Sequence, residues 1–208
     1  MSNAERHLNS LMRQLAAQQT VELVHPFSDL KTFGSLVYVA ECFGFRYAGV
    51  RIVGRHKVLH VDLVRDPEPW AQQRAAANVA AFPQVGLGGP VPGMYLNSLT
   101  PVPEAQADVD LITSLIRYDG LVVAGDRRKL LTIGWGSGAL FLLLALLTGT
   151  YVVLLPLAVV MPAFVLGALR INTVRRANLA RRLTAAGCTP VRDEKGVERF
   201  VRPVPYTA

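Results

Sequence analysis

The chain has 208 residues, of which 51% are hydrophobic, and a formal net charge of +7 at pH 7. This length allows one modest domain beside a membrane segment and excludes a large multidomain architecture. The charge distribution argues against a dedicated nucleic-acid surface, because residues 1–126 carry 10 Lys and Arg against 12 Asp and Glu. Arginine outnumbers lysine by 18 to 4, a bias typical of high-GC bacterial or phage genomes.

The first part of the chain predicts an amphipathic helix, a strand and a second helix. Over residues 3–19 apolar side chains recur at helical spacing, namely Leu8, Leu11, Met12 and Leu15. Residues 21–25 follow as a short strand, and a helix is predicted over residues 28–43. Within that helix, residues 36–39 would also suit a strand. The N-terminus lacks the basic-then-apolar layout of a cleavable signal peptide, so we expect none.

The clearest strand signal is a β-hairpin. Two runs of strand-forming residues, 45–53 and 57–65, are joined by a Gly-Arg-His turn at residues 54–56. In the second run apolar side chains alternate with His60 and Asp62, which places these two on the solvated face. His60 and Asp62 would suit a base with its orienting carboxylate, or a weak metal site. The favoured interpretation is that both are ordinary polar residues on the solvent-exposed face of the hairpin.

A third helix is predicted over residues 68–81, followed by a long loop over residues 82–103. The loop is rich in proline and glycine, and long loops in small domains are often functional or mobile. Its glycine run at residues 86–89 lacks the spacing and the Lys-Ser/Thr pair of known phosphate cradles, and neighbouring prolines remove backbone donors. We therefore expect no phosphate site there.

A fourth helix at residues 104–117 and a short strand at residues 121–124 complete the first domain. Asp108 and Asp110 lie two residues apart on this helix and point away from each other, so they make a poor carboxylate pair. The chain contains no HExxH, GxSxG, Walker A, CxxC or EF-hand motif. We assign no catalytic, cofactor-binding or metal-ligating residue, and we expect the protein not to be an enzyme.

Residues 130–169 contain no Asp, Glu, Lys, Arg or His, and no soluble domain needs an apolar stretch of this length. A single helix of 40 residues would be about 60 Å long, twice the hydrocarbon core of about 30 Å. A Thr-Gly-Thr turn at residues 148–150 divides the stretch into two helices, 130–147 and 151–169. Each helix is close to the minimum length that crosses a bilayer.

Basic residues at both ends of this stretch predict its orientation. Residues 127–129 add three positive charges, residues 170–208 carry 9 basic against 3 acidic side chains, and the turn is uncharged. By the positive-inside rule, both termini face the cytoplasm of a cell membrane, where Cys42 and Cys188 stay reduced. Basic side chains beside the bilayer attract anionic headgroups. The candidate lipid contacts are Arg127, Arg128, Lys129, Arg170, Arg175 and Arg176.

Small residues predict how the two membrane helices pack. Gly134 and Gly138 lie four apart on the first helix, and Ala163 and Gly167 lie four apart on the second. In an antiparallel hairpin these pairs fall at matching depths, and small residues at this spacing let backbones approach closely. The same face could instead serve self-association, or the residues could simply reflect the composition of membrane helices. Two prolines in the second helix predict a kink.

The residues after the membrane segment predict a helix and a β-hairpin. The helix continues over residues 170–186 and stops at Gly187. Residues 188–192 and 197–202 flank a turn-forming sequence. Because a lone two-stranded hairpin is marginal in water, we expect it to pair with the earlier strands.

The sequence thus predicts an α+β cytoplasmic domain, with a small sheet and flanking helices, plus a two-helix transmembrane hairpin. Residues 1–129 form the domain, residues 130–169 form the hairpin, and residues 170–208 pack back on the domain. The favoured function is a membrane-anchored, non-catalytic assembly or interaction component of a membrane complex, with other membrane proteins or further copies as partners. The alternatives are a ligand-sensing effector whose hairpin oligomerises, and a membrane-tethered enzyme.

Overall fold

The structure is a computed structural model that describes residues 3–24, 30–54, 58–124, 127–192, 196 and 198–202. The side chains of residues 124 and 127–129 lie outside this description. The chain divides into two units, Leu121–Arg182 and the remainder, which joins Met1–Gly120 to Leu183–Ala208. Over the described ranges the fold is α+β, with six helices and two small sheets.

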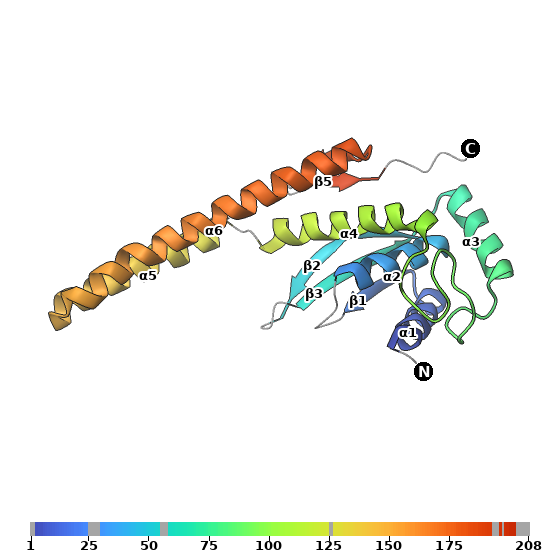
Figure 1. Ribbon diagram of the computed structural model, residues 1–208, viewed down its shortest axis with the longest axis horizontal. Helices are drawn as coiled ribbons and strands as arrows, with labels where there is room; N and C mark the ends of the chain where they lie inside the picture. Colours follow the sequence, from blue (N-terminus) through green and yellow to red (C-terminus); the bar gives the residue numbers. More distant parts are fainter. Residues whose placement is uncertain are drawn as a thin grey trace. The chain divides into compact units, whose positions relative to one another are not determined.

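A three-stranded antiparallel sheet lies in the first unit (Figure 1). Its strands are β1 (Thr20–Val24), β2 (Phe45–Val53) and β3 (Val58–Arg65). β3 is central and pairs with both neighbours, so β1 and β2 form the edges. The predicted strands are confirmed, whereas the residues of their predicted turn at 55–56 lie outside the described ranges.

A bulge in β2 keeps the apolar residues of this strand on one face of the sheet. The pairing register shifts between Tyr47 and Gly49, so Ala48 has no partner on β3. Phe45 and Val50 are an odd number of residues apart and would face opposite sides of a regular strand. Both are nevertheless buried, because the extra residue restores the alternation.

Three helices pack against the apolar face of the sheet: α1 (Asn3–Ala17), α2 (Leu30–Cys42) and α4 (Pro103–Ala124). Their buried residues join those of the strands in one core, including Leu8, Leu11, Phe33, Val37, Val109, Ile112 and Ile116. Gly34 brings α2 close to α4, because a Cβ there would collide with the Thr113 side chain. α3 (Pro69–Ala81) comes directly after β3 in the sequence.

α4 continues through residues 121–124, where the sequence predicted a short strand, so that prediction is wrong. A short run of Leu and Val does not distinguish a strand from a buried helix. Helical continuation satisfies the backbone within the segment itself and needs no neighbouring strand. Gly120 does not interrupt the helix, and its missing side chain leaves Leu59 of β3 close to the α4 backbone.

The predicted loop between α3 and α4 is irregular, and it is anchored on the core. Its buried apolar side chains are Val85, Val91 and Met94. Within the glycine run, the N–H groups of Leu87 and Gly89 donate to Gln84 O at 3.0 and 3.1 Å. These two amides therefore form part of a local turn.

The C-terminal strands β4 (Thr189–Arg192) and β5 (Glu198–Val201) form a separate two-stranded sheet. The prediction that they pair with the earlier strands is wrong for the described residues. Side chains hold this hairpin on the first unit instead, and Phe200 packs edge-on against Tyr118 of α4, with ring centroids 5.0 Å apart. The predicted turn at residues 193–195 lies outside the described ranges.

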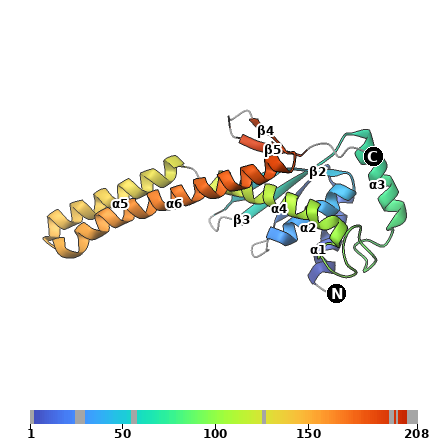
Figure 2. The same ribbon diagram turned by 45° about the horizontal axis from the view of Figure 1, so that its top comes forward.

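The second unit is built mainly from α5 (Arg127–Thr148) and α6 (Tyr151–Ala185), two antiparallel helices that lie side by side (Figures 1 and 2). The turn falls at the predicted Thr-Gly-Thr sequence. Gly149 has a φ of +69° and its N–H donates to Ala145 O, as expected where a helix ends in a left-handed residue. We call α5 and the part of α6 up to Arg182 the helical pair.

Candidate functional site

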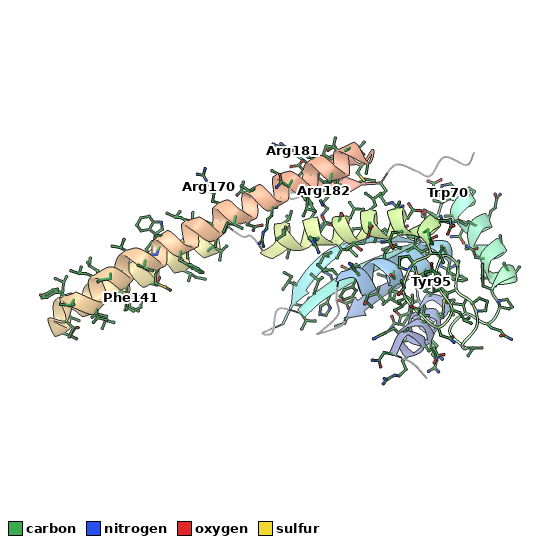
Figure 3. The ribbon with its side chains drawn as sticks, in the orientation of Figure 1. Trp70, Tyr95, Phe141, Arg170, Arg181 and Arg182 are labelled. Carbon is green, nitrogen blue, oxygen red and sulfur yellow. The ribbon has the colours of Figure 1, made fainter. Side chains whose placement is uncertain are left out.

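The helical pair presents apolar side chains to its surroundings over most of its length. Both helices are long and apolar enough to cross a membrane, within Leu130–Thr148 and Tyr151–Ala185. Val152 is 90% exposed and Leu147 is 74% exposed. Figure 3 shows side chains projecting along the pair, Phe141 among them. In water so large an apolar surface would need a covering partner or would promote aggregation.

Hydroxyl side chains within the pair donate to their own helices. Ser137 donates to Gly134 O at 2.9 Å, and Thr148 donates to Leu144 O at 2.7 Å. Thr148 also lies 2.6 Å from the Thr150 hydroxyl across the turn. Side chains that satisfy themselves on the preceding helical turn can enter an environment without water.

Two glycines of α5 lie at the contact between the helices. A Cβ at Gly138 would stand 2.9 Å from both Ala158 O and Pro162 Cγ, and a Cβ at Gly134 would stand 3.1 Å from Val165 Cβ. Gly136, on the opposite side of α5, has nothing within 4 Å. Gly138 in particular has no room for any side chain, because the backbone of α6 occupies that space.

The buried positions of the pair follow the spacing of antiparallel coiled helices. On α5 these are Gly134, Gly138 and Ala145, with Phe141 half-buried between them. On α6 the half-buried positions are Leu154, Ala158, Pro162, Val165 and Leu169. Steps of three and four residues keep one stripe of each helix facing the other. Ala163 and Gly167, predicted to face α5, are exposed, and nothing lies within 4 Å of a Cβ at Gly167.

Gly138 faces a part of the α6 backbone that Pro162 alters. Proline has no N–H, so the carbonyl of Ala158, four residues earlier, loses its helical donor. The Cβ position of Gly138 lies 2.9 Å from this oxygen, so a Cα hydrogen of glycine points toward it. Such Cα–H···O contacts are weak hydrogen bonds that recur where helices pack closely. The glycine therefore permits the close approach of α5 to the carbonyl that Pro162 leaves without its helical donor.

The helical pair supplies no carboxylate of its own beside its basic residues, since residues 127–192 contain no Asp or Glu. Arg127, Arg128 and Lys129 form the first turn of α5, and their side chains lie outside the described part of the structure. On α6, Arg170 and Arg175 are exposed and Arg176 is half-buried. Figure 3 shows Arg170 extending away from the helix, with Arg181 on the same side. Exposed guanidinium groups at these positions suit phosphate.

The candidate pair His60 and Asp62 lies on the outer face of the sheet, and the two residues do not bond to each other. His60 Nδ1 lies 2.5 Å from Glu22 Oε1 of β1. Asp62 accepts two hydrogen bonds from Arg51 of β2, at 2.6 and 2.8 Å, and Arg51 also donates to Glu22. This is a cross-strand charge network that links all three strands. Sequence reasoning missed Glu22 and Arg51, because their roles depend on strand order.

A second set of polar side chains comes from α2 and consists of Tyr38, Glu41 and Cys42. Burial raises the pKa of the Cys42 thiol to about 11 and that of the Tyr38 hydroxyl to about 12. Glu41 accepts a hydrogen bond from Arg202 at 2.5 Å. Burial also raises the pKa of Glu41, and the charge of Arg202 is the largest influence that opposes this. Cys42 and Cys188 are both free and buried.

Alkaline pH is expected to destabilise the first unit through Cys42. A thiol whose pKa is raised in the folded state favours folding fully below its unfolded pKa near 9, and this contribution is lost as pH rises through 11. The loss should reach about 2 kcal/mol. Urea unfolding followed by Trp70 fluorescence, in a Trp135→Phe background, measures it between pH 8 and 11. Cys42→Ala should flatten this dependence, and an equally steep curve in that variant would contradict the assignment.

The described residues hold no group of three or more His, Cys, Asp or Glu that could bind a metal. Asp108 and Asp110 of α4 both have protein partners: Asp108 accepts from Arg202, and Asp110 accepts from Gln106. Comparison with protein-family models, with curated proteins and with solved structures gives no match to this chain.

Proposed function

We propose that this protein is a membrane-anchored, non-catalytic component of a bacterial or phage membrane complex. In this proposal α5 and α6 cross the cell membrane as a hairpin, and both termini lie in the cytoplasm. The α+β unit offers the surface on which other proteins assemble. The basic residues at the ends of α5 and at Arg170, Arg175 and Arg176 hold anionic lipid headgroups.

The exposed apolar surface of the helical pair is the observation that carries this proposal. The pair contains no charge between residues 130 and 169, yet its large side chains point away from the contact between the helices. Transfer of that apolar surface from water into hydrocarbon would stabilise the pair by about 25 cal/mol for each Å². The self-satisfied hydroxyls of Ser137 and Thr148 add to the support, since a bilayer offers no water to replace those bonds.

The non-catalytic assignment rests on how the polar candidates are used. His60, Asp62 and Asp108 each have a partner that explains them structurally. A base or metal ligand needs a free lone pair directed into an accessible site. These residues instead tie neighbouring strands and helices together, which suits a rigid assembly surface.

Introduced cysteines test the topology, because the native ones cannot report it. Cys42 and Cys188 are buried, so slow labelling of either thiol would not distinguish one side of a membrane from the other. A cysteine at Thr150, in the exposed turn, should react with a membrane-impermeant maleimide in intact cells. A cysteine at Ala80, exposed on α3, should react only after the cells are permeabilised.

Two results would contradict the topology. Labelling of the Ala80→Cys protein in intact cells would place the α+β unit outside. Recovery of both variants in a detergent-free supernatant, with equal labelling, would contradict the proposal that the helical pair anchors the protein in a membrane. The unmodified chain is the matched control, since its two buried thiols give the background.

A further inference from the structure

Besides Ala71 and Ala105, five buried apolar residues of the first unit lie outside its main core. Two come from α4, Leu115 and Tyr118, and three come from the C-terminal end, Leu183, Cys188 and Phe200. The edge-on contact of Tyr118 and Phe200 joins the two groups. α4 therefore has two buried sides, one against the main core and one beneath the C-terminal segment. We call the described residues 183–192 and 198–202 the strap.

Charged side chains fasten the end of the strap. Arg202 donates to Glu41 Oε2 of α2 at 2.5 Å and to Asp108 Oδ1 of α4 at 2.9 Å. One guanidinium thus bridges two helices of the main core. Arg199 adds a longer contact, with Nη1 3.4 Å from Ala48 O at the bulge of β2.

No backbone ladder joins the described part of the strap to the three-stranded sheet. An isolated two-stranded hairpin is marginally stable by itself. Among the described contacts, the strap is held by one small apolar cluster, by the bonds of Arg202 and by the contact of Arg199, whereas the main core has its own sheet and helices. Regions held by few contacts open at lower free energy than the core that they cover.

We propose that the strap is a latch, which detaches from α4 and returns while the main core stays folded. The chain runs from α6 into the strap without a break. The opening of the strap itself does not depend on where the helical pair resides.

The two native cysteines provide a direct test, because Cys188 is a buried residue of the strap and Cys42 lies in the main core. The full chain in mild detergent is treated with a small maleimide, and the labelling rate of each thiol is followed by mass spectrometry. Arg202→Gln removes the clamp and should raise the labelling rate of Cys188 about tenfold, as expected for the loss of a charge-assisted hydrogen bond. Cys42 should keep its wild-type rate. Asp108→Asn removes one exposed acceptor and should give a smaller rise, about threefold.

Arg51→Gln is the matched control, because it also removes an ion-paired arginine but lies on the outer face of the sheet. It should leave Cys188 unchanged, and Arg202→Lys should restore part of the protection. An equal rise for Cys42 and Cys188 in both clamp variants would overturn the latch, since the unit would then open as a whole.

Discussion

Replacing Leu140 with Arg is expected to weaken insertion of α5 into a bilayer by about 3 kcal/mol, or roughly 100-fold. Leu140 lies near the middle of the apolar part of α5 and is 54% exposed, so its side chain would face lipid. An arginine at that depth must give up water or deform the bilayer. Because the residue lies away from the contact between the helices, the substitution changes the surroundings of the pair and leaves its packing intact.

Membrane fractionation of cells that express each variant measures this effect. The Leu140→Arg protein should shift from the membrane pellet to aggregates or degradation products, whereas Leu140→Phe, the matched apolar control, should stay in the pellet. In water the expectation reverses, since arginine would remove exposed apolar surface and improve solubility. A soluble, folded Leu140→Arg protein would therefore contradict the membrane anchor.

The elements that the sequence predicts correctly are those whose periodicity is set by one buried face. β3 alternates between Val61 and Leu63, which are buried, and His60 and Asp62, which are not. The helices of the first unit are similarly marked by apolar residues at helical spacing, as at Leu8, Leu11 and Leu15. In such segments water distinguishes the two faces, so the pattern is visible in the chain itself.

The contact face of α6 could not be predicted in this way. Every side of its first nineteen residues is apolar, so no polar face indicates which side meets α5. The expectation that small residues face each other favoured Ala163 and Gly167, while the described contact uses Pro162 and Val165. At this contact Gly138 lies against Ala158 O and Pro162, a closeness that only a residue without a side chain allows.

Pairings distant in sequence were also beyond the reach of local patterns. Glu22 meets His60 because β1 lies beside β3, and this strand order comes from α2 crossing between β1 and β2. Likewise, nothing local links Arg202 to Glu41, which lies 161 residues earlier. The sequence could predict the separate elements, but the partner of each polar side chain depended on the assembled fold.

Adding one methyl group at Gly138 is expected to destabilise the helical pair by about 1–3 kcal/mol, the usual cost of overpacking a tight contact. A Cβ there would stand 2.9 Å from Ala158 O, and neither backbone can yield without separating the helices. The substitution would also displace the Cα hydrogen that points to the carbonyl freed by Pro162. Gly138→Leu should exceed this effect, because its larger side chain has no space at all.

Gly136→Ala is the control that isolates the contact. Both substitutions replace a glycine of the same helix, so each gains the same helix propensity of about 1 kcal/mol. Gly136 faces open space, and its variant should be neutral or slightly more stable. Unfolding of the purified chain in increasing sodium dodecyl sulfate, followed by circular dichroism, compares the two. Equal stabilities would show that the approach at Gly138 does not hold α5 against α6. A loss confined to Gly138→Ala would assign the packing to this glycine and the carbonyl opposite it.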